Sequence, residues 1–151
     1  MDNAEIQAVK SINKDASNVF DKIAPSWYGF RHHTIFRTEL EELAKRWQRG
    51  KLLNIGCAHG PDFLPFKDNF ELYGVDFSTE MLKLAPKYAQ KFDFKINLAQ
   101  ADVRYLPFPD ERFDWAISVA TYHHIKGGDA RVKAFQELKR VLKSGGEAFI
   151  T

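Results

Sequence analysis

The sequence predicts an α/β fold, in which a parallel sheet is covered by helices on both faces. Short apolar, strand-like segments alternate along the chain with segments whose apolar residues recur at helical spacing. A turn bounded by Gly56 and Gly60 directly follows the first of these strands. Repeated strand–helix units are typical of parallel sheets with right-handed crossovers. A chain of 151 residues is long enough for one such domain.

Each expected element has its own signal. Apolar or β-branched runs predict strands over residues 51–55, 71–75, 95–102, 113–120 and 146–151. Helical spacing predicts helices over residues 34–47, 79–92 and 129–143, with Ser78 as an N-cap. Pro61 is expected to open a further helix, whereas Pro86 should kink its helix or end it. We expect a single domain 1–151, with an N-terminal helical cap (1–48) and a strand–helix core (51–151).

Composition limits the classes of function. Lys and Arg number 22 and Asp and Glu 20, and the resulting net charge of +2 permits a nucleic-acid partner without indicating one. The single cysteine, Cys57, excludes an internal disulfide and is expected to be a small apolar filler. No apolar run has the length of a signal peptide core or a membrane span. We therefore expect a cytoplasmic protein without membrane contact.

Polar residues follow several of the expected strands. Asp76 stands 20 positions after Gly56 (76 minus 56), the distance at which an acid reaches the hydroxyls of a ribose bound at a glycine turn. Asp102 ends the third expected strand, and Tyr122, His123 and His124 follow the fourth. Because ligands of such sheets bind beyond the carboxyl ends of the strands, these residues mark the expected site.

The motifs distinguish between two cofactor classes. The nicotinamide fingerprint G-x-G-x-x-G fails, because Ala58 and Pro61 occupy two of its glycine positions. The segments G-x-A-x-G, "GVDFSTEML", "ADVRYLPFPDERFDWAISV" and "ELKRVLKSGGEAFI" instead occur in the order of the class I methyltransferase motifs. The chain from residue 52 to 151 thus resembles S-adenosyl-L-methionine (SAM) dependent methyltransferases of type 11, which have a Rossmann-like sheet.

The resemblance implies SAM as the cofactor and a role for each matching residue. The turn would lie against the methionine part, Asp76 would bind the ribose, and Asp102 with Val103 would bind the adenine edge. Two residues depart from the family pattern: Asn54 replaces an acid and Ala58 a glycine, so we expect weakened rather than abolished binding. The implied cofactor-binding residues are Asn54, Gly56, Cys57, Ala58, Gly60, Asp76, Phe77, Met81, Asp102, Val103 and Ala120.

Two segments point to a subfamily. "VFDKIAPSWYGFRHH" and "ATYHHIKGGDARVKAFQELKRVLK" are similar to segments of wobble-uridine tRNA methyltransferases, which methylate a carboxymethyl group on uridine. This similarity implies tRNA and a small zinc-binding activator subunit as partners, and substrate contacts by Trp27, Tyr28, Arg31 and Tyr122. A small-molecule methyltransferase and a non-catalytic SAM-binding fragment are the alternatives.

The histidine pairs have several interpretations. His123 or His124 is the expected general base if the methyl acceptor is a hydroxyl or an amine, since imidazole titrates near neutrality; both could instead only line the rim of the site. A metal site is not expected, because neither these residues nor His32 and His33 have a further ligand at matching spacing.

The end of the sequence raises a last expectation. The resembled family has seven strands, and the last two are absent after the strand 146–151. That strand would then have an open edge, which favours pairing with another chain. We expect a shortened domain that binds SAM, methylates poorly and self-associates through this edge.

Overall fold

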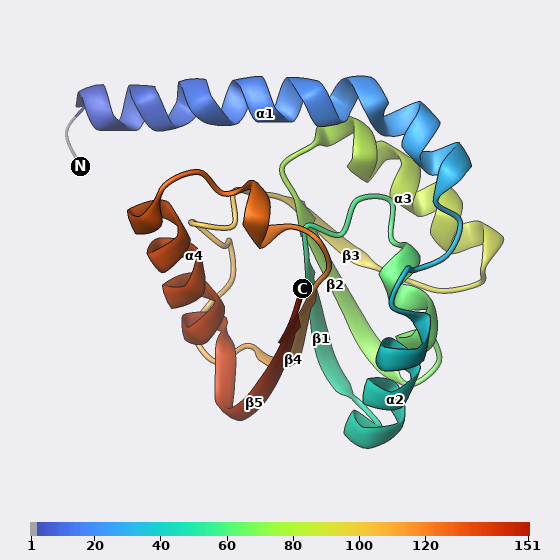
Figure 1. The fold of residues 1–151 in the computed structure, drawn as a ribbon. Coiled ribbons are helices and arrows are strands. Elements are labelled where there is room, and N and C mark those ends of the chain that lie inside the picture. Colours follow the sequence, from blue (N-terminus) through green and yellow to red (C-terminus); the bar gives the residue numbers. More distant parts are fainter. Residues whose placement is uncertain (1–2) are drawn as a thin grey trace.

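A parallel sheet of five strands in the order β3-β2-β1-β4-β5 forms the centre of the protein (Figure 1). The computed structural model describes the backbone of residues 3–151 and the side chains from residue 17 onward. The strands are β1 (Gly50–Ile55), β2 (Phe70–Asp76), β3 (Asn97–Gln100), β4 (Phe113–Ser118) and β5 (Leu142–Ile150). All four neighbouring pairs are parallel, which confirms the predicted fold class.

Helices cover both faces of this sheet. They are α1 (Asn3–Phe30), α2 (Arg37–Trp47), α3 (Thr79–Lys91) and α4 (Gly128–Val141), with short 3₁₀ helices η1 (Pro61–Phe66) and η2 (Tyr122–His124). From β1 the chain moves toward one edge of the sheet to form β2 and then β3. From β4, which lies on the other side of β1, it moves toward the opposite edge to form β5. Right-handed crossovers in opposite directions place their helices on opposite faces. α4 therefore packs on one face, and η1 and α3 on the other.

Alternate residues of the strands feed two separate cores. Leu53 and Ile55 of β1 join Phe113 and the α4 residues in one cluster. Leu52, the residue before Leu53, packs with residues of α2 and η1 in the other cluster. This alternation is the period of a pleated strand that is buried on both faces.

α1 passes over the carboxyl ends of the strands and packs on α3 (Figure 1). α1 and α2 lie in the segment predicted as an N-terminal helical cap (1–48), of which Met1 and Asp2 lie outside the described residues; the division into cap and core stays a prediction. Pro25 lies inside α1. In the part of the chain that the structure describes, no helix is both long and apolar enough to span a membrane.

Pro61 opens a helix as predicted, but the details of three predicted helices differ from the expectation. Pro61 opens a six-residue 3₁₀ helix, not an α-helix, because a second proline, Pro65, follows within the segment. α3 runs through Pro86 to Lys91 without ending, since its buried side keeps its packing while Pro86 itself is exposed. α2 begins at Arg37 instead of residue 34.

Several strand boundaries also differ from the prediction: β3 begins at Asn97 instead of residue 95, and β4 ends at Ser118 instead of residue 120. β3 ends at Gln100, so that Asp102 lies two residues beyond it; the Asp102 carboxylate accepts the backbone N–H of Arg104 at 2.9 Å and turns the chain there. β5 begins at Leu142, directly after α4, instead of residue 146. The N–H of Arg112 donates to the carbonyl of Val141 at 2.8 Å, which extends the sheet to the helix end.

α4 holds the loop that connects β3 to β4. The Glu137 carboxylate accepts the N–H of Leu106 at 2.8 Å, and the Arg140 guanidinium donates to the carbonyls of Leu106 and Phe108 at 3.0 and 2.7 Å. The pKa of Glu137 is lowered mainly by its hydrogen bonds from Arg140. The loop that carries Asp102 is thus attached to α4, on the face of the sheet opposite to α3 and η1.

The tight packing of β2 against the glycine turn can be tested at Gly74. An added Cβ would stand 2.7 Å from Cys57 Sγ and 3.1 Å from Phe63 Cζ. Gly74→Ala should lower the free energy of unfolding by about 1–3 kcal/mol, the usual cost of overpacking. In denaturant titrations, the added cost of Gly74→Ala should be smaller in a Cys57→Ala background. An equal cost in both backgrounds would contradict this contact.

Candidate cofactor-binding site

The glycine turn after β1 contacts the end of β2 and the segment that follows β4. The N–H groups of Gly56 and Cys57 both donate to the carbonyl of Val75, at 2.8 and 3.0 Å. Gly56 has φ +73°, and a Cβ there would lie 2.1 Å from Thr121 Oγ1. Gly60 has φ +100°. Both positions therefore require glycine, because of conformation and, at Gly56, also because of space.

Asp76 joins the end of β2 to this turn. Its carboxylate accepts the N–H of Ala58 at 2.8 Å and the N–H of Ser78 at 2.9 Å. Burial raises the pKa of Asp76, and these backbone hydrogen bonds oppose the shift. A carboxylate has about four acceptor positions, so acceptor capacity remains beyond these backbone hydrogen bonds for a ribose hydroxyl. The predicted role of Asp76 fits its position.

Ala58, which replaces a glycine of the family pattern, adopts a left-handed conformation with φ +48°. This conformation costs a non-glycine residue about 1–2 kcal/mol. The hydrogen bond to Asp76 offsets part of that cost. The substitution thus keeps the shape of the turn.

Asn54 lies two residues before Gly56 and is fully buried, with 0% of its surface exposed. Neither its amide nitrogen nor its amide oxygen has a hydrogen-bond partner among the residues that the structure describes. An unsatisfied buried amide costs about 1–3 kcal/mol. The ammonium and carboxylate of an amino-acid ligand are groups that an amide could bind, so Asn54 fits the methionine end of SAM.

The other predicted cofactor residues have diverse surroundings. Cys57 is buried, as its prediction as a filler requires, and burial raises the pKa of its thiol. Met81 is buried, and Phe77 is half-buried with its ring edge-on to Phe20 of α1. Asp102 forms an ion pair with Arg104. The adenine contact of Asp102 stays a prediction, as does that of Val103, which packs beside the core.

The segment after β4 contributes Ala120 and the predicted catalytic residues. Ala120 has φ +55°, and its N–H donates to the hydroxyl of Thr151 at 3.0 Å. His123 and His124 are exposed, with ring centroids 4.0 Å apart. Partial burial, and then the neighbouring His123, lower the pKa of His124. A neutral His124 can accept a proton at the site edge.

Tyr122, a predicted substrate contact, lies in the core, and its contact with a substrate stays a prediction. The residue is 5% exposed and belongs to the core beneath α4, and its ring centroid lies 4.7 Å from that of Phe135. Its hydroxyl has no hydrogen-bond partner within the described residues, and burial raises its pKa. The side chain at this position is directed to the core because η2 turns the chain immediately after Thr121.

The remaining predicted substrate residues gather at the end of α1. The Arg31 guanidinium bonds Asp62 of η1 at 3.2 Å, and the two side chains are only 10% and 3% exposed. It also lies 5.7 Å from the Trp27 ring centre. The Tyr28 ring meets His59 of the glycine turn at 5.0 Å. Arg31 thus ties α1 to the turn, and its predicted substrate contact is untested.

His59 and Asp62 were not predicted as site residues. The Nε2–H of His59 donates to the carbonyl of Arg31 at 2.7 Å. Burial lowers the pKa of His59 to about 4, whereas it raises the pKa of Asp62 against the effect of Arg31. The only sequence signal was their place within and just after the glycine turn, since burial of both depends on α1.

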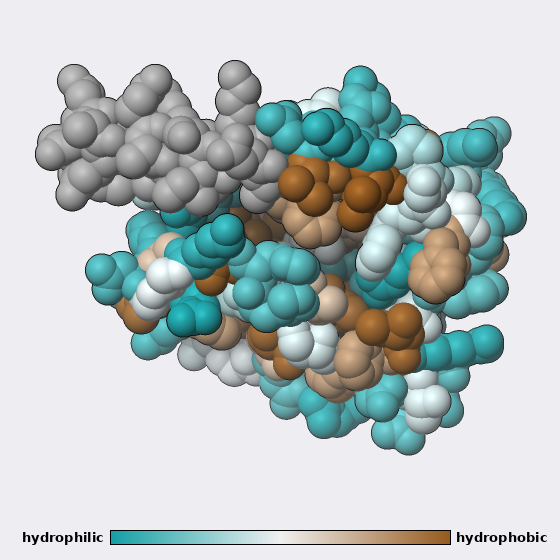
Figure 2. All heavy atoms as spheres, turned by 45° about the horizontal axis from the view of Figure 1, so that its top comes forward, coloured by the Kyte–Doolittle hydropathy of each residue, from teal (hydrophilic) through white to brown (hydrophobic). Residues whose placement is uncertain are grey.

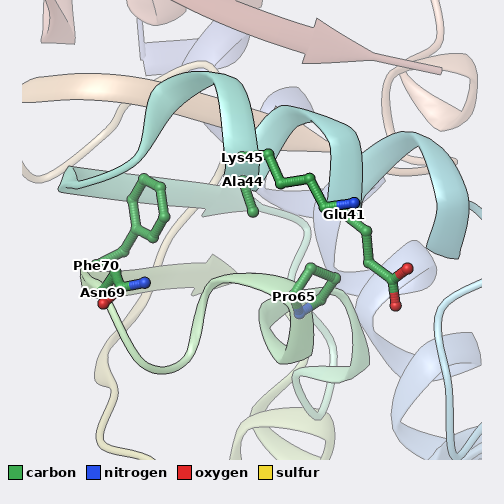
Figure 3. A pocket seen from close by; sticks show the side chains of 6 residues that line it. All are labelled: Glu41, Ala44, Lys45, Pro65, Asn69 and Phe70. Atoms are coloured by element: carbon green, nitrogen blue, oxygen red, sulfur yellow. The ribbon is translucent and has the colours of Figure 1, made fainter.

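A shallow pocket of about 260 Å³ lies elsewhere, beside the amino end of β2 (Figure 3). It is formed by α2, η1 and the start of β2, with the lining residues Glu41, Ala44, Lys45, Pro65, Asn69 and Phe70. None of them is a predicted site residue. Among the described side chains, no three metal-ligating residues come together either.

A glycine turn, an acid at the end of β2 and the strand order together define a nucleotide-cofactor domain of the doubly wound α/β class. The sequence matches the family described as "Methyltransferase domain" over residues 53–150. The chain therefore belongs to this methyltransferase family. The predicted family and its cofactor, SAM, are confirmed at this level.

Relatives of different specificity resemble the chain. A tRNA (carboxymethyluridine(34)-5-O)-methyltransferase of Schizosaccharomyces pombe is 28% identical over 90% of this chain and 56% of its own length. A 2-phytyl-1,4-naphtoquinone methyltransferase of Nostoc punctiforme is 30% identical over 92% of this chain and 64% of its own. The chain thus spans about three fifths of these two relatives.

A solved structure shows the same fold. A putative SAM-dependent methyltransferase from Methanococcus maripaludis is 25% identical and superimposes with a TM-score of 0.69. The match covers 92% of this chain and 63% of that protein.

Asn54 gives the first test of the site. Asn54→Leu removes both unsatisfied polar atoms, so the free energy of unfolding of the free protein should rise by about 1 kcal/mol. The same change should weaken binding of S-adenosylhomocysteine roughly tenfold, because one hydrogen bond to a charged group is lost. Calorimetry and denaturant titration measure the two effects. Asn54→Asp, with the family's usual residue, should bind more tightly; an unchanged affinity in both variants would remove Asn54 from the site.

His59 gives a pH-dependent test. Its pKa is lower in the folded protein, about 4, than its ordinary 6.5, so the folded state binds fewer protons between these values. The stabilisation is present above pH 6.5 and is lost as the pH falls toward 4. His59→Gln keeps a side-chain N–H donor that does not titrate, and should flatten the dependence of unfolding free energy on pH in this window. Parallel curves for both proteins would contradict a buried neutral imidazole.

Proposed function

We propose that this chain transfers a methyl group from SAM to the carboxylate of a carboxymethyl-modified wobble uridine in tRNA. The proposal is supported by the hydrogen bond that connects the glycine turn to Asp76, in a chain of which 90% matches the S. pombe tRNA methyltransferase. Relatives named as tRNA (carboxymethyluridine(34)-5-O)-methyltransferases also occur in Arabidopsis thaliana and Mus musculus.

The chain's own residues have mainly binding tasks in this reaction. SAM, when bound, supplies an activated methyl group. The turn and Asp76 hold the cofactor at the sheet edge, and α1 shields this edge from water. A carboxylate acceptor is already a nucleophile, so no residue has to remove a proton. Alignment of the reacting groups can supply roughly 7–11 kcal/mol of the rate enhancement.

A small-molecule acceptor is the second candidate, and the quinone methyltransferase relative favours it. An acceptor that carries a proton needs a base. His124 suits this role, because it is exposed after β4 and its lowered pKa keeps it neutral at pH 7. The tRNA proposal does not require this role.

Partners follow from the same proposal. We propose tRNA and a small zinc-binding activator subunit as binding partners. Self-association through β5 is a further proposal: within the described residues, the edge of β5 that faces away from β4 pairs with no strand, and an open edge favours pairing with another chain.

The acceptor can be decided by turnover assays. The assay contains radiolabelled SAM, the chain and a zinc-binding activator subunit from a wobble-uridine tRNA methyltransferase. The chain should then methylate tRNA that carries carboxymethyluridine and not the same tRNA without that group. The rate below saturation should fall by at least about tenfold between 50 and 200 mM salt, because phosphate contacts release counterions. Asp76→Ala is the control that should remove cofactor binding.

Turnover of a naphthoquinol without tRNA would favour the second candidate. Binding of the cofactor without turnover of any acceptor would favour the non-catalytic alternative.

A further inference from the structure

One face of α1 contacts the loops that follow β2 and β4. Ser17, Phe20 and Asp21 are spaced three and four residues apart, which places them on the same side of the helix. The Ser17 hydroxyl lies 3.4 Å from the carbonyl of Phe77. These contacts bring a helix that is remote in sequence to the edge of the cofactor site.

Asp21 caps the first turn of α3 from outside that helix. Its Oδ1 accepts the hydroxyl hydrogen of Ser78 at 2.6 Å and the N–H of Glu80 at 3.1 Å. The first N–H groups of a helix have no partner within the helix, and a carboxylate there is also favoured by the helix dipole. Asp21 therefore fixes Ser78 and the start of α3 to α1.

Ser78 connects Asp21 to the glycine turn through Asp76. Its hydroxyl also accepts the N–H of Met81 at 3.2 Å, and its own N–H donates to Asp76 Oδ1 at 2.9 Å. The other oxygen of Asp76 accepts the N–H of Ala58. A continuous series of hydrogen bonds thus runs from α1 through Ser78 and Asp76 to the glycine turn.

Phe20 adds an apolar contact beside this series. Its ring meets Phe77, after β2, at 5.4 Å and His124, after β4, at 5.3 Å, both edge-on. Apolar side chains gather along the part of α1 that is coloured in Figure 2, and the surface is recessed between this helix and the loops below it. α1 therefore bridges the two loops between which the cofactor edge lies.

We propose that Asp21 is a positioning residue of the cofactor site, and that cofactor binding and the docking of α1 are thermodynamically linked. By holding Ser78, Asp21 keeps the Asp76 carboxylate in place for the ribose. Linkage is reciprocal: a cofactor that binds better with α1 docked also stabilises the docked helix. The inference rests on the proposed cofactor role of Asp76.

Two substitutions separate the hydrogen bonds of Asp21 from its charge. Asp21→Ala removes the acceptor and should weaken S-adenosylhomocysteine binding about tenfold, within the usual range for coupled sites. Asp21→Asn keeps an acceptor for Ser78 and Glu80 and should restore the affinity to within about threefold of the unaltered chain. Lys22→Ala, an exposed neighbour on the same helix, is the matched control and should bind normally. Calorimetry measures all four proteins.

Hydrogen exchange supplies a readout that a purely structural role would not change. S-adenosylhomocysteine should increase amide protection over residues 17–30 in the unaltered chain and leave it unchanged in Asp21→Ala. Normal affinity of a folded Asp21→Ala protein would overturn the role of Asp21. If that variant does not fold, the unaltered chain decides: no added protection over residues 17–30 overturns the linkage. An unaltered chain that does not bind the ligand would instead overturn the proposed function.

Discussion

The candidate site depends on the buried carboxylate of Asp76. Removing this group from water raises its pKa, and the N–H groups of Ala58 and Ser78 offset the cost. Because one donor comes from the glycine turn and the other from the start of α3, the same carboxylate fixes both segments relative to β2. The left-handed conformation of Ala58 persists for this reason, although the residue is not a glycine.

The strand order brings the parts of the site together. β1 lies between β2 and β4, so the segments that follow these three strands meet at one edge of the sheet. Gly56 shows how close they are, since only a hydrogen fits between its Cα and Thr121. On the other face, Glu137 and Arg140 hold the loop after β3. Each loop of the site is therefore attached to a rigid element.

Several polar groups around the glycine turn are buried, which lowers the free energy of unfolding compared with apolar side chains at the same positions. The side chain of Asn54 has no hydrogen-bond partner in the described part of the chain. His59 and Asp62 are buried beside the end of α1, where the Arg31 side chain is 10% exposed. Apolar side chains at these positions would cost less to bury. Their position around the glycine turn, together with the cap that Asp21 provides, makes α1 part of the site and not only a cover for the core.

The sequence alone was sufficient for the existence of β1, β2 and β4, the glycine turn, the Ser78 cap and the place of Asp76 at the end of β2, because short-range patterns and backbone conformation specify them. It failed where a distant partner decides: β5 starts early because Val141 pairs with Arg112. The burial of Tyr122 against Phe135 of α4 likewise has no local signal. Asp21 carried no recognisable signal, and His59 and Asp62 had only their place within and just after the glycine turn, because the contacts of all three with distant segments exist only once α1 lies across the sheet. Chain separation is the physical reason: Asp21 meets Ser78 across 57 residues, and no local pattern encodes that contact.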